Sequence, residues 1–178
     1  ACHMNEFKYC LPAAIWLKDQ GYKIGFNLMQ INNANEGKIA KLLKLANTYP
    51  IDVLYFADSM GSLNTQQITT IVNTFKDNWS GAIGIHAHDS MGNAINNSMQ
   101  AVNDGASWVD CTVTGMGRGP GNAQTEYLSI ELDSYRNLDT NKTKLFKLIR
   151  NHFNPLKEQY GWGINPYYYL AGKHNIHP

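Results

Sequence analysis

Two histidines, His86 and His88, stand two residues apart at the end of the apolar run AIGIHAHD, residues 82–89. If this run is a β-strand, residues i and i+2 point to the same side, with Cα atoms roughly 7 Å apart. Both imidazoles could then bind one cation through a nitrogen each. The plainer alternative is that one or both rings only form hydrogen bonds in a polar cleft. Two ligands do not complete a site, so a carboxylate is expected from elsewhere, a set that suits Mn²⁺, Fe²⁺, Co²⁺, Zn²⁺ or Mg²⁺.

One apolar run earlier, the stretch YFADSMG (residues 55–61) places Asp58 at the end of its run. An aspartate at the end of a strand could orient a metal-bound histidine or hold a substrate. We therefore take Asp58 as a candidate catalytic residue. It could equally cap or hydrogen-bond the turn that follows.

A third stretch, GMGRGPGN (residues 115–122), places glycines around Arg118 and ends at Asn122. Glycine lets the backbone approach a ligand closely, and N–H groups near the start of the next helix could hold a carboxylate or phosphate. The stretch lacks the Gly-Lys-Ser/Thr ending of a P-loop and the pattern of a dinucleotide fingerprint. Arg118 is a candidate catalytic residue that binds an anion, or it lies exposed to solvent. Asn122 either ligates a metal or caps the following helix.

Apolar runs and helical segments alternate along the chain with a period of roughly thirty residues. The runs rich in β-branched and aromatic residues are predicted strands, residues 22–31, 51–58, 82–89 and 108–115, and the opening ACH is expected to end an earlier strand. Helices are predicted from apolar stripes after Asn35 and Asn64 and from Ala94, and over residues 12–20, 123–135 and 141–160, the last interrupted near Pro155. This alternation predicts an α/β fold with a parallel sheet. We divide the chain into a partial barrel, residues 1–136, and a helical, aromatic extension, residues 137–178.

Polar residues gather at the C-terminal end of each predicted strand, among them Asn27, Gln30 and Thr114. A (β/α)₈ barrel draws its site from several strands at that face, whereas an open doubly wound sheet concentrates the site at one switch point. The distribution therefore favours a barrel. It also makes Asn27, Gln30 and Thr114 candidate substrate-binding residues.

Composition and charge exclude several classes of function. The formal net charge is +1, which gives no basis for electrostatic binding to nucleic acid or to an acidic membrane. No apolar run approaches the ~20 residues that span a bilayer. The cysteines, Cys2, Cys10 and Cys111, are odd in number and widely spaced, so we expect reduced thiols and a cytoplasmic protein.

Taken together, YFADSMG and the segment from GIHAHDSMGNA to TGMGRGPGNAQTE resemble a superfamily of metal-dependent aldolases and lyases. It includes 4-hydroxy-2-oxovalerate aldolase, 3-hydroxy-3-methylglutaryl-CoA lyase and the isopropylmalate synthases, and the aldolase branch looks nearest. The resemblance implies the C-terminal half of a (β/α)₈ TIM barrel, about strands five to eight, with His86, His88 and Asn122 as metal ligands. The family's metal-binding Asp and catalytic Arg, which lie on the first strand, have no counterpart here. We therefore expect a carboxylate, the third ligand beside the two histidines, and the general base upstream of Ala1.

The resemblance also implies a reaction. It is the metal-dependent cleavage or formation of a 4-hydroxy-2-oxo acid, giving pyruvate and an aldehyde through a metal-stabilised enolate, with Mn²⁺, Mg²⁺, Co²⁺ or Zn²⁺ as cofactor. As partners we expect a small 2-oxo-acid substrate, further copies of the chain in a homo-oligomer and, following the resembling bacterial aldolases, an aldehyde dehydrogenase. Two alternatives stay open: a Claisen-condensing synthase that uses an acyl-CoA, and a half-barrel without catalytic activity.

Overall fold

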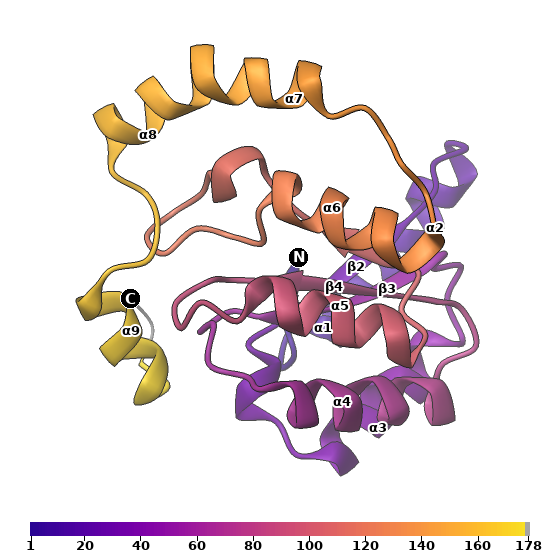
Figure 1. Ribbon diagram of the computed structural model, residues 1–178. Helices are drawn as coiled ribbons and strands as arrows, with labels where there is room; N and C mark the ends of the chain where they lie inside the picture. Colours follow the sequence, from indigo (N-terminus) through magenta and orange to yellow (C-terminus); the bar gives the residue numbers. More distant parts are fainter. Residues whose placement is uncertain (177–178) are drawn as a thin grey trace.

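The computed structural model describes residues 1–176, in which five parallel strands form one sheet in sequence order. The strands are β1 (Cys2–His3), β2 (Gly25–Met29), β3 (Val53–Asp58), β4 (Ala82–Ala87) and β5 (Trp108–Asp110). Each strand lies beside the next one along the chain, and every pairing is parallel. Helices connect the strands (Figure 1), as in part of a (β/α)₈ barrel. The predicted fold class is confirmed.

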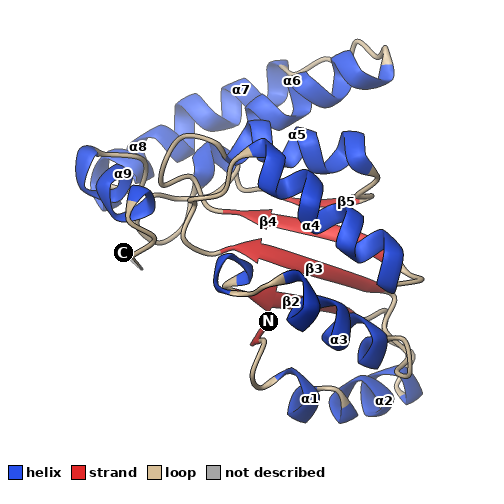
Figure 2. Ribbon diagram, turned by 90° about the horizontal axis from the view of Figure 1, so that it is seen from below, coloured by secondary structure: helices blue, strands red, loops and turns tan. Residues whose placement is uncertain are grey.

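Helices cover one face of this sheet (Figure 2). They are α1 (Phe7–Cys10), α2 (Pro12–Asp19), α3 (Glu36–Ala46), α4 (Thr65–Asn78), α5 (Ala94–Asp104) and, after β5, α6 (Thr125–Arg136). Two of them begin where the sequence predicts: the Asn35 side chain accepts from Lys38 N at the start of α3, and Asn64 forms a capping box with Gln67 at the start of α4. No helix within residues 1–176 is long and apolar enough to cross a membrane.

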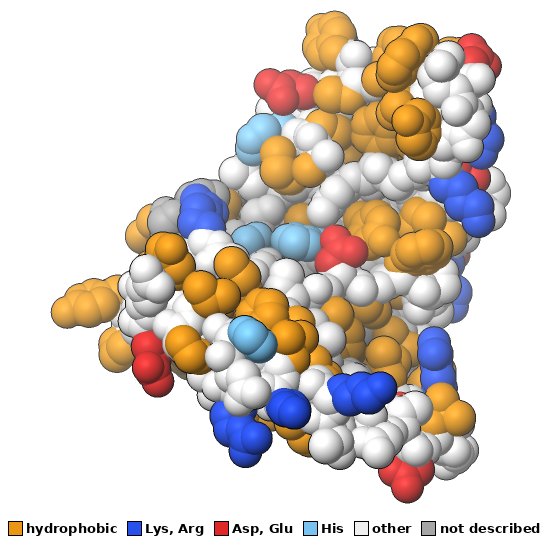
Figure 3. All heavy atoms as spheres, turned by 90° about the horizontal axis from the view of Figure 1, so that it is seen from above, with side chains coloured by type: hydrophobic (Ala, Val, Ile, Leu, Met, Phe, Trp, Pro, Cys, Tyr) orange, Lys and Arg blue, Asp and Glu red, His pale blue; other side chains and the backbone are white. Residues whose placement is uncertain are grey.

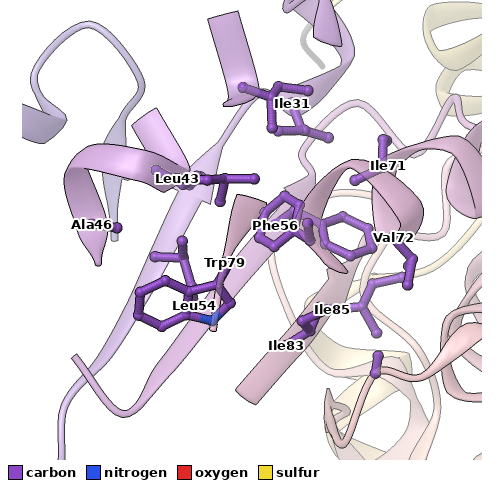
Figure 4. Close-up of a cluster of buried hydrophobic side chains, with 14 of the residues drawn as sticks. Ile31, Leu43, Ala46, Leu54, Phe56, Ile71, Val72, Trp79, Ile83 and Ile85 are labelled. Atoms are coloured by element: carbon purple, nitrogen blue, oxygen red, sulfur yellow. The ribbon is translucent and has the colours of Figure 1, made fainter. Parts of the chain in front are cut away.

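The core lies between the sheet and these helices (Figure 4). Leu54 and Phe56 of β3 and Ile83 and Ile85 of β4 are buried there, and the Phe56 ring lies 5.5 Å from that of Phe75 in α4. Fully burying one such side chain stabilises the fold by about 1.5–3 kcal/mol. Since successive side chains of a strand point to opposite faces, this core also fixes which residues face the other side of the sheet.

All four predicted strands are shorter than expected, most of all the runs 22–31 and 108–115, which form β2 and β5. Gln30, with φ 57°, ends β2, and a short 3₁₀ turn (Val113–Gly115) takes the place of the last residues of the 108–115 run. Within that turn Thr114 has φ 55°. Extended pairing cannot continue through such residues, so Gln30 ends β2 at Met29, and Thr114 turns the chain four residues after the end of β5.

The C-terminal extension consists of an arm and a returning helix (Figure 1). The arm is α7 (Thr143–Leu148), a π-helical turn (Ile149–Phe153) and α8 (Asn154–Tyr160), so the predicted interruption lies just before Pro155. The returning helix, α9 (Pro166–Lys173), was not predicted. It is capped by the Asn165 side chain, which accepts from two backbone N–H groups. Gly172 of α9 packs against the turn after β4, and Asn175 contacts the loops after β2 and β3.

Candidate active site

The face of the sheet opposite the core carries the predicted histidine pair. Alternation from the buried Ile85 places His86 and then His88 on this face, and their ring centroids lie 5.2 Å apart at 77°. Figure 3 looks at the molecule from the side opposite to Figure 2 and shows histidine and acidic side chains in its hollowed middle. The two rings are therefore close enough to share a ligand. That they bind a metal stays a prediction.

An aspartate that the sequence reasoning missed joins this pair. Asp110 lies beside His86 in the register of β4 and β5, and its Oδ2 is 3.1 Å from His86 Nδ1. Tyr55, on β3, also lies close to Asp110. The pKa of Tyr55 is raised, first by burial and then by the negative charge of Asp110. The alternation of side chains along WVDCTVT could indicate which face of the strand Asp110 occupies. It could not indicate the contact with His86, which depends on the register between β4 and β5.

Asn122 reaches the same place from the glycine-rich loop. Its backbone forms an isolated antiparallel bridge with His88, which puts both side chains on the same side. Gly121, with φ 78°, makes this turn possible, because a Cβ there would lie 2.3 Å from the Gly115 oxygen. Asn122 Nδ2 donates to Met116 O at 3.2 Å, while Asn122 Oδ1 is buried with no hydrogen-bond partner. A buried oxygen left without a donor needs an explanation, and a bound cation would supply one.

Asp58 is placed differently from the histidines. It lies two residues after Phe56 in β3, so its side chain points toward the helices as that of Phe56 does, and it is fully buried. Its carboxylate accepts from Ser62 N and Leu63 N, both at 3.1 Å, and from Asn32 Nδ2 at 2.7 Å. Burial raises the pKa of Asp58, and these hydrogen bonds oppose the rise. They anchor the loop after β3, and a catalytic role for Asp58 stays a prediction.

Arg118 lies on the outer part of the glycine-rich loop, beside the C-terminal extension. It lines a pocket of about 310 Å³ together with Tyr160, Trp162 and Tyr168. The extension holds this loop directly, since Trp162 Nε1 donates to Thr114 O at 3.0 Å and Gly163 N donates to Gly119 O at 3.0 Å. An anion-binding role for Arg118 stays a prediction.

The three candidate substrate-binding residues have different surroundings. Asn27 pairs in register with Tyr55, and its Oδ1 is buried without a hydrogen-bond partner. Gln30 lines a polar pocket of about 260 Å³ with His3 and its neighbours. The Thr114 hydroxyl already donates to Val113 O at 2.7 Å, and Thr114 N donates to the buried Glu126 at 2.9 Å. Of the three, Asn27 has the clearest unused capacity to bind a ligand.

Within residues 1–176 no group of three His, Cys, Asp or Glu side chains is arranged to hold a metal ion. The structure thus brings together two histidines and one amide oxygen. A catalytic metal site commonly has three protein ligands. Here the third would be the Asn122 amide oxygen, or another group would have to join the two histidines.

The chain is similar to proteins named 4-hydroxy-2-oxovalerate aldolase. It is 36% identical over 128 residues to that of Pelotomaculum thermopropionicum, which covers 72% of this chain and 38% of the relative. With that of Bacillus cereus it is 28% identical over 158 residues, covering 88% and 46%. The chain therefore spans less than half the length of these relatives.

Two solved structures share the fold. The N-terminal domain of a putative aldolase from Bacteroides vulgatus superimposes with a TM-score of 0.91 at 30% identity, over 99% of this chain and 58% of that one. The HMG-CoA lyase of Bacillus subtilis superimposes with a TM-score of 0.73 at 19% identity, over 94% and 59%, which is a likeness of fold alone. The model of the HMGL-like family matches residues 3–151. This chain belongs to the HMGL-like family.

Proposed function

We propose that this protein is a divalent-metal-dependent aldolase that cleaves, or forms, a 4-hydroxy-2-oxo acid to give pyruvate and an aldehyde. One observation carries the proposal: the side-chain oxygen Oδ1 of Asn122 is buried without a hydrogen-bond partner, next to the paired histidines. The names of the relatives support the choice of reaction.

In this proposal His86, His88 and Asn122 hold the cation, and a carboxylate from outside the described residues completes the site. Imidazole nitrogen and amide oxygen suit Mn²⁺, Co²⁺ or Zn²⁺, and Mg²⁺ where further oxygen ligands are present. The bound cation would serve as a Lewis acid for the negative charge that develops on the substrate as the carbon–carbon bond breaks.

The other candidates take supporting roles. Asn27 accepts a hydrogen bond from the substrate through its free Oδ1, and Gln30 contributes from the edge of the same face. Thr114 acts through its backbone, by fixing the start of the glycine-rich loop. Asp58 anchors the loop after β3, and Arg118 binds an anionic group at the mouth of the site.

The setting of the enzyme is also proposed. The three cysteines are free, which supports a reducing, cytoplasmic location. We place a boundary between the barrel and its extension near residue 136, although the family match continues to 151. A homo-oligomer and an aldehyde dehydrogenase that receives the product are the partners we propose.

The test compares two reactions in the purified protein. Pyruvate release from 4-hydroxy-2-oxo acids is expected, it should stop with a chelator, and it should return when Mn²⁺ or Co²⁺ is added. His86→Ala should abolish it, whereas His152→Ala, a change at an exposed histidine of the extension, should not. Thiol release from an acyl-CoA in the presence of a 2-oxo acid would instead establish the Claisen-condensing synthase. If the metal-loaded protein shows neither activity, the result would favour the non-catalytic alternative.

A further inference from the structure

We propose that Asp110 and Tyr55 form a positioning relay that fixes the tautomer and the orientation of His86, and thereby sets the metal affinity of the site. The proposal rests on the proposed function, in which His86 is a metal ligand. The relay runs across three neighbouring strands, from Tyr55 on β3 to Asp110 on β5 and back to His86 on β4.

The first step of the relay is the contact between Asp110 and His86. Asp110 Oδ2 lies 3.1 Å from His86 Nδ1, which is hydrogen-bonding distance. An ionised carboxylate has no proton to donate, so it can only accept this hydrogen bond. The ring proton is therefore held on Nδ1, which leaves the lone pair of Nε2 for a cation. Both side chains are only part-buried, 28% and 44% exposed, so the pair does not serve the core. A metal-binding histidine commonly has such a carboxylate partner.

The second step is the contact between Tyr55 and Asp110, which lie on strands that are not neighbours. Between them runs β4, and the residue beside Tyr55 in the register is Gly84. A Cβ at position 84 would lie 2.3 Å from the Tyr55 ring, so the ring passes directly over this glycine. The ring therefore extends from β3 toward β5, where burial and then the nearby charge of Asp110 raise the pKa of the Tyr55 hydroxyl. The glycine at 84 is what allows a tyrosine of β3 to approach an aspartate of β5.

The relay accounts for three features at once. It explains a part-buried tyrosine with a polar partner on this face, a glycine in the middle of a strand, and an aspartate aimed at the histidine rather than at solvent. Asp110 is a positioning residue here, because it acts on the cation through His86. The competing explanation is that Asp110 is itself a metal ligand.

The experiment has two readouts on the full-length protein. The first is the His86 tautomer in the metal-free protein, read from long-range ¹⁵N–¹H correlations of histidine rings. The second is the affinity for Mn²⁺ alone, measured by calorimetric titration. Asp110→Ala and Tyr55→Phe are the variants, and Asp104→Ala is the matched control, because Asp104 is also a hydrogen-bonded carboxylate but lies between α4 and α5.

In the wild type we expect the Nδ1–H tautomer at His86. Asp110→Ala should release it to a mixture and weaken Mn²⁺ binding about 10- to 100-fold, the loss usual for such partners. Tyr55→Phe, which removes one oxygen and keeps the ring, should shift both readouts in the same direction by a smaller factor. Asp104→Ala should change neither.

The proposal is overturned if Asp110→Ala leaves the His86 tautomer unchanged, whatever happens to the affinity. Weaker binding with an unchanged tautomer would show that Asp110 is a direct ligand. If the wild type binds no Mn²⁺, the metal site of the proposed function fails, while the tautomer still decides whether Asp110 orients His86. Should Asp110→Ala not fold, Tyr55→Phe gives the answer alone.

Discussion

Replacing Gly84 by alanine should push the Tyr55 ring off the sheet and destabilise the fold. The added Cβ would lie 2.3, 2.4 and 2.7 Å from three atoms of the ring, distances that real contacts do not reach. A ring cannot bend away as a flexible chain end does, so Tyr55 or the strand must move. Overpacking of this kind costs about 1–3 kcal/mol.

Gly25 provides a matched control on the other side of the same ring. A Cβ at Gly25 would lie 3.4 Å from Tyr55 Cε2, which is an ordinary contact. Gly25→Ala should therefore be close to neutral, or gain up to about 0.4–1 kcal/mol because the unfolded chain loses freedom. The two variants differ in position alone, so their difference isolates the clash.

Urea denaturation followed by tryptophan fluorescence measures this difference as a change in the free energy of unfolding. For a chain of this length each kcal/mol should lower the melting temperature by roughly 2–4 °C. We expect Gly84→Ala to melt below the wild type and Gly25→Ala at or above it. Equal stability of the two variants would refute the placement of Tyr55 over Gly84, and with it the route by which Tyr55 reaches Asp110.

Two further predictions concern the C-terminal extension. Trp162→Phe removes a buried N–H that donates to Thr114 O and leaves that oxygen unpaired. The change should lower the free energy of unfolding by about 1–3 kcal/mol. Trp108→Phe, at a half-exposed position, is the control and should have little effect in the same denaturation assay. Asp133 contacts Lys142 and accepts two hydrogen bonds from Thr140, and these contacts, the one to Lys142 first, lower the pKa of Asp133 from 3.8 to about 2. Their stabilising effect is present above pH 3.8 and is lost as the pH falls toward 2. The stability gap between wild type and Asp133→Asn should therefore close over that interval in acid titrations of unfolding, and a gap that is constant with pH would contradict the assignment.

The parts of the fold that local sequence determines could be predicted. Asn35 and Asn64 mark helix starts because a side chain and a backbone N–H three residues on suffice for a cap. His86 and His88 share a face because alternation in a strand needs no tertiary information. The orientation of Asp58 toward the helices follows from the same rule, since Asp58 shares the parity of Phe56, and could have been predicted.

The contacts between distant segments could not be predicted. Asp110 meets His86 only because β5 pairs with β4 in one register, and a shift by one residue would turn Asp110 to the other face. Helix α9 could not be predicted because its exposed aromatic residues form no apolar stripe along one face. The segment just before α9 contacts the glycine-rich loop through Trp162 and Gly163, whose partners, Thr114 and Gly119, lie more than forty residues earlier in the chain.

The proposed function depends most directly on one metal site made by His86, His88 and Asn122. The decisive measurement is a titration of the purified protein with Mn²⁺ or Co²⁺, repeated with an alanine at each of the three positions and with His152→Ala as control. We predict one divalent cation per chain in the wild type and in the control, and strongly weakened binding in the other three variants. Binding that is unchanged in all three variants, or no binding in the wild type, would contradict the proposed metal site.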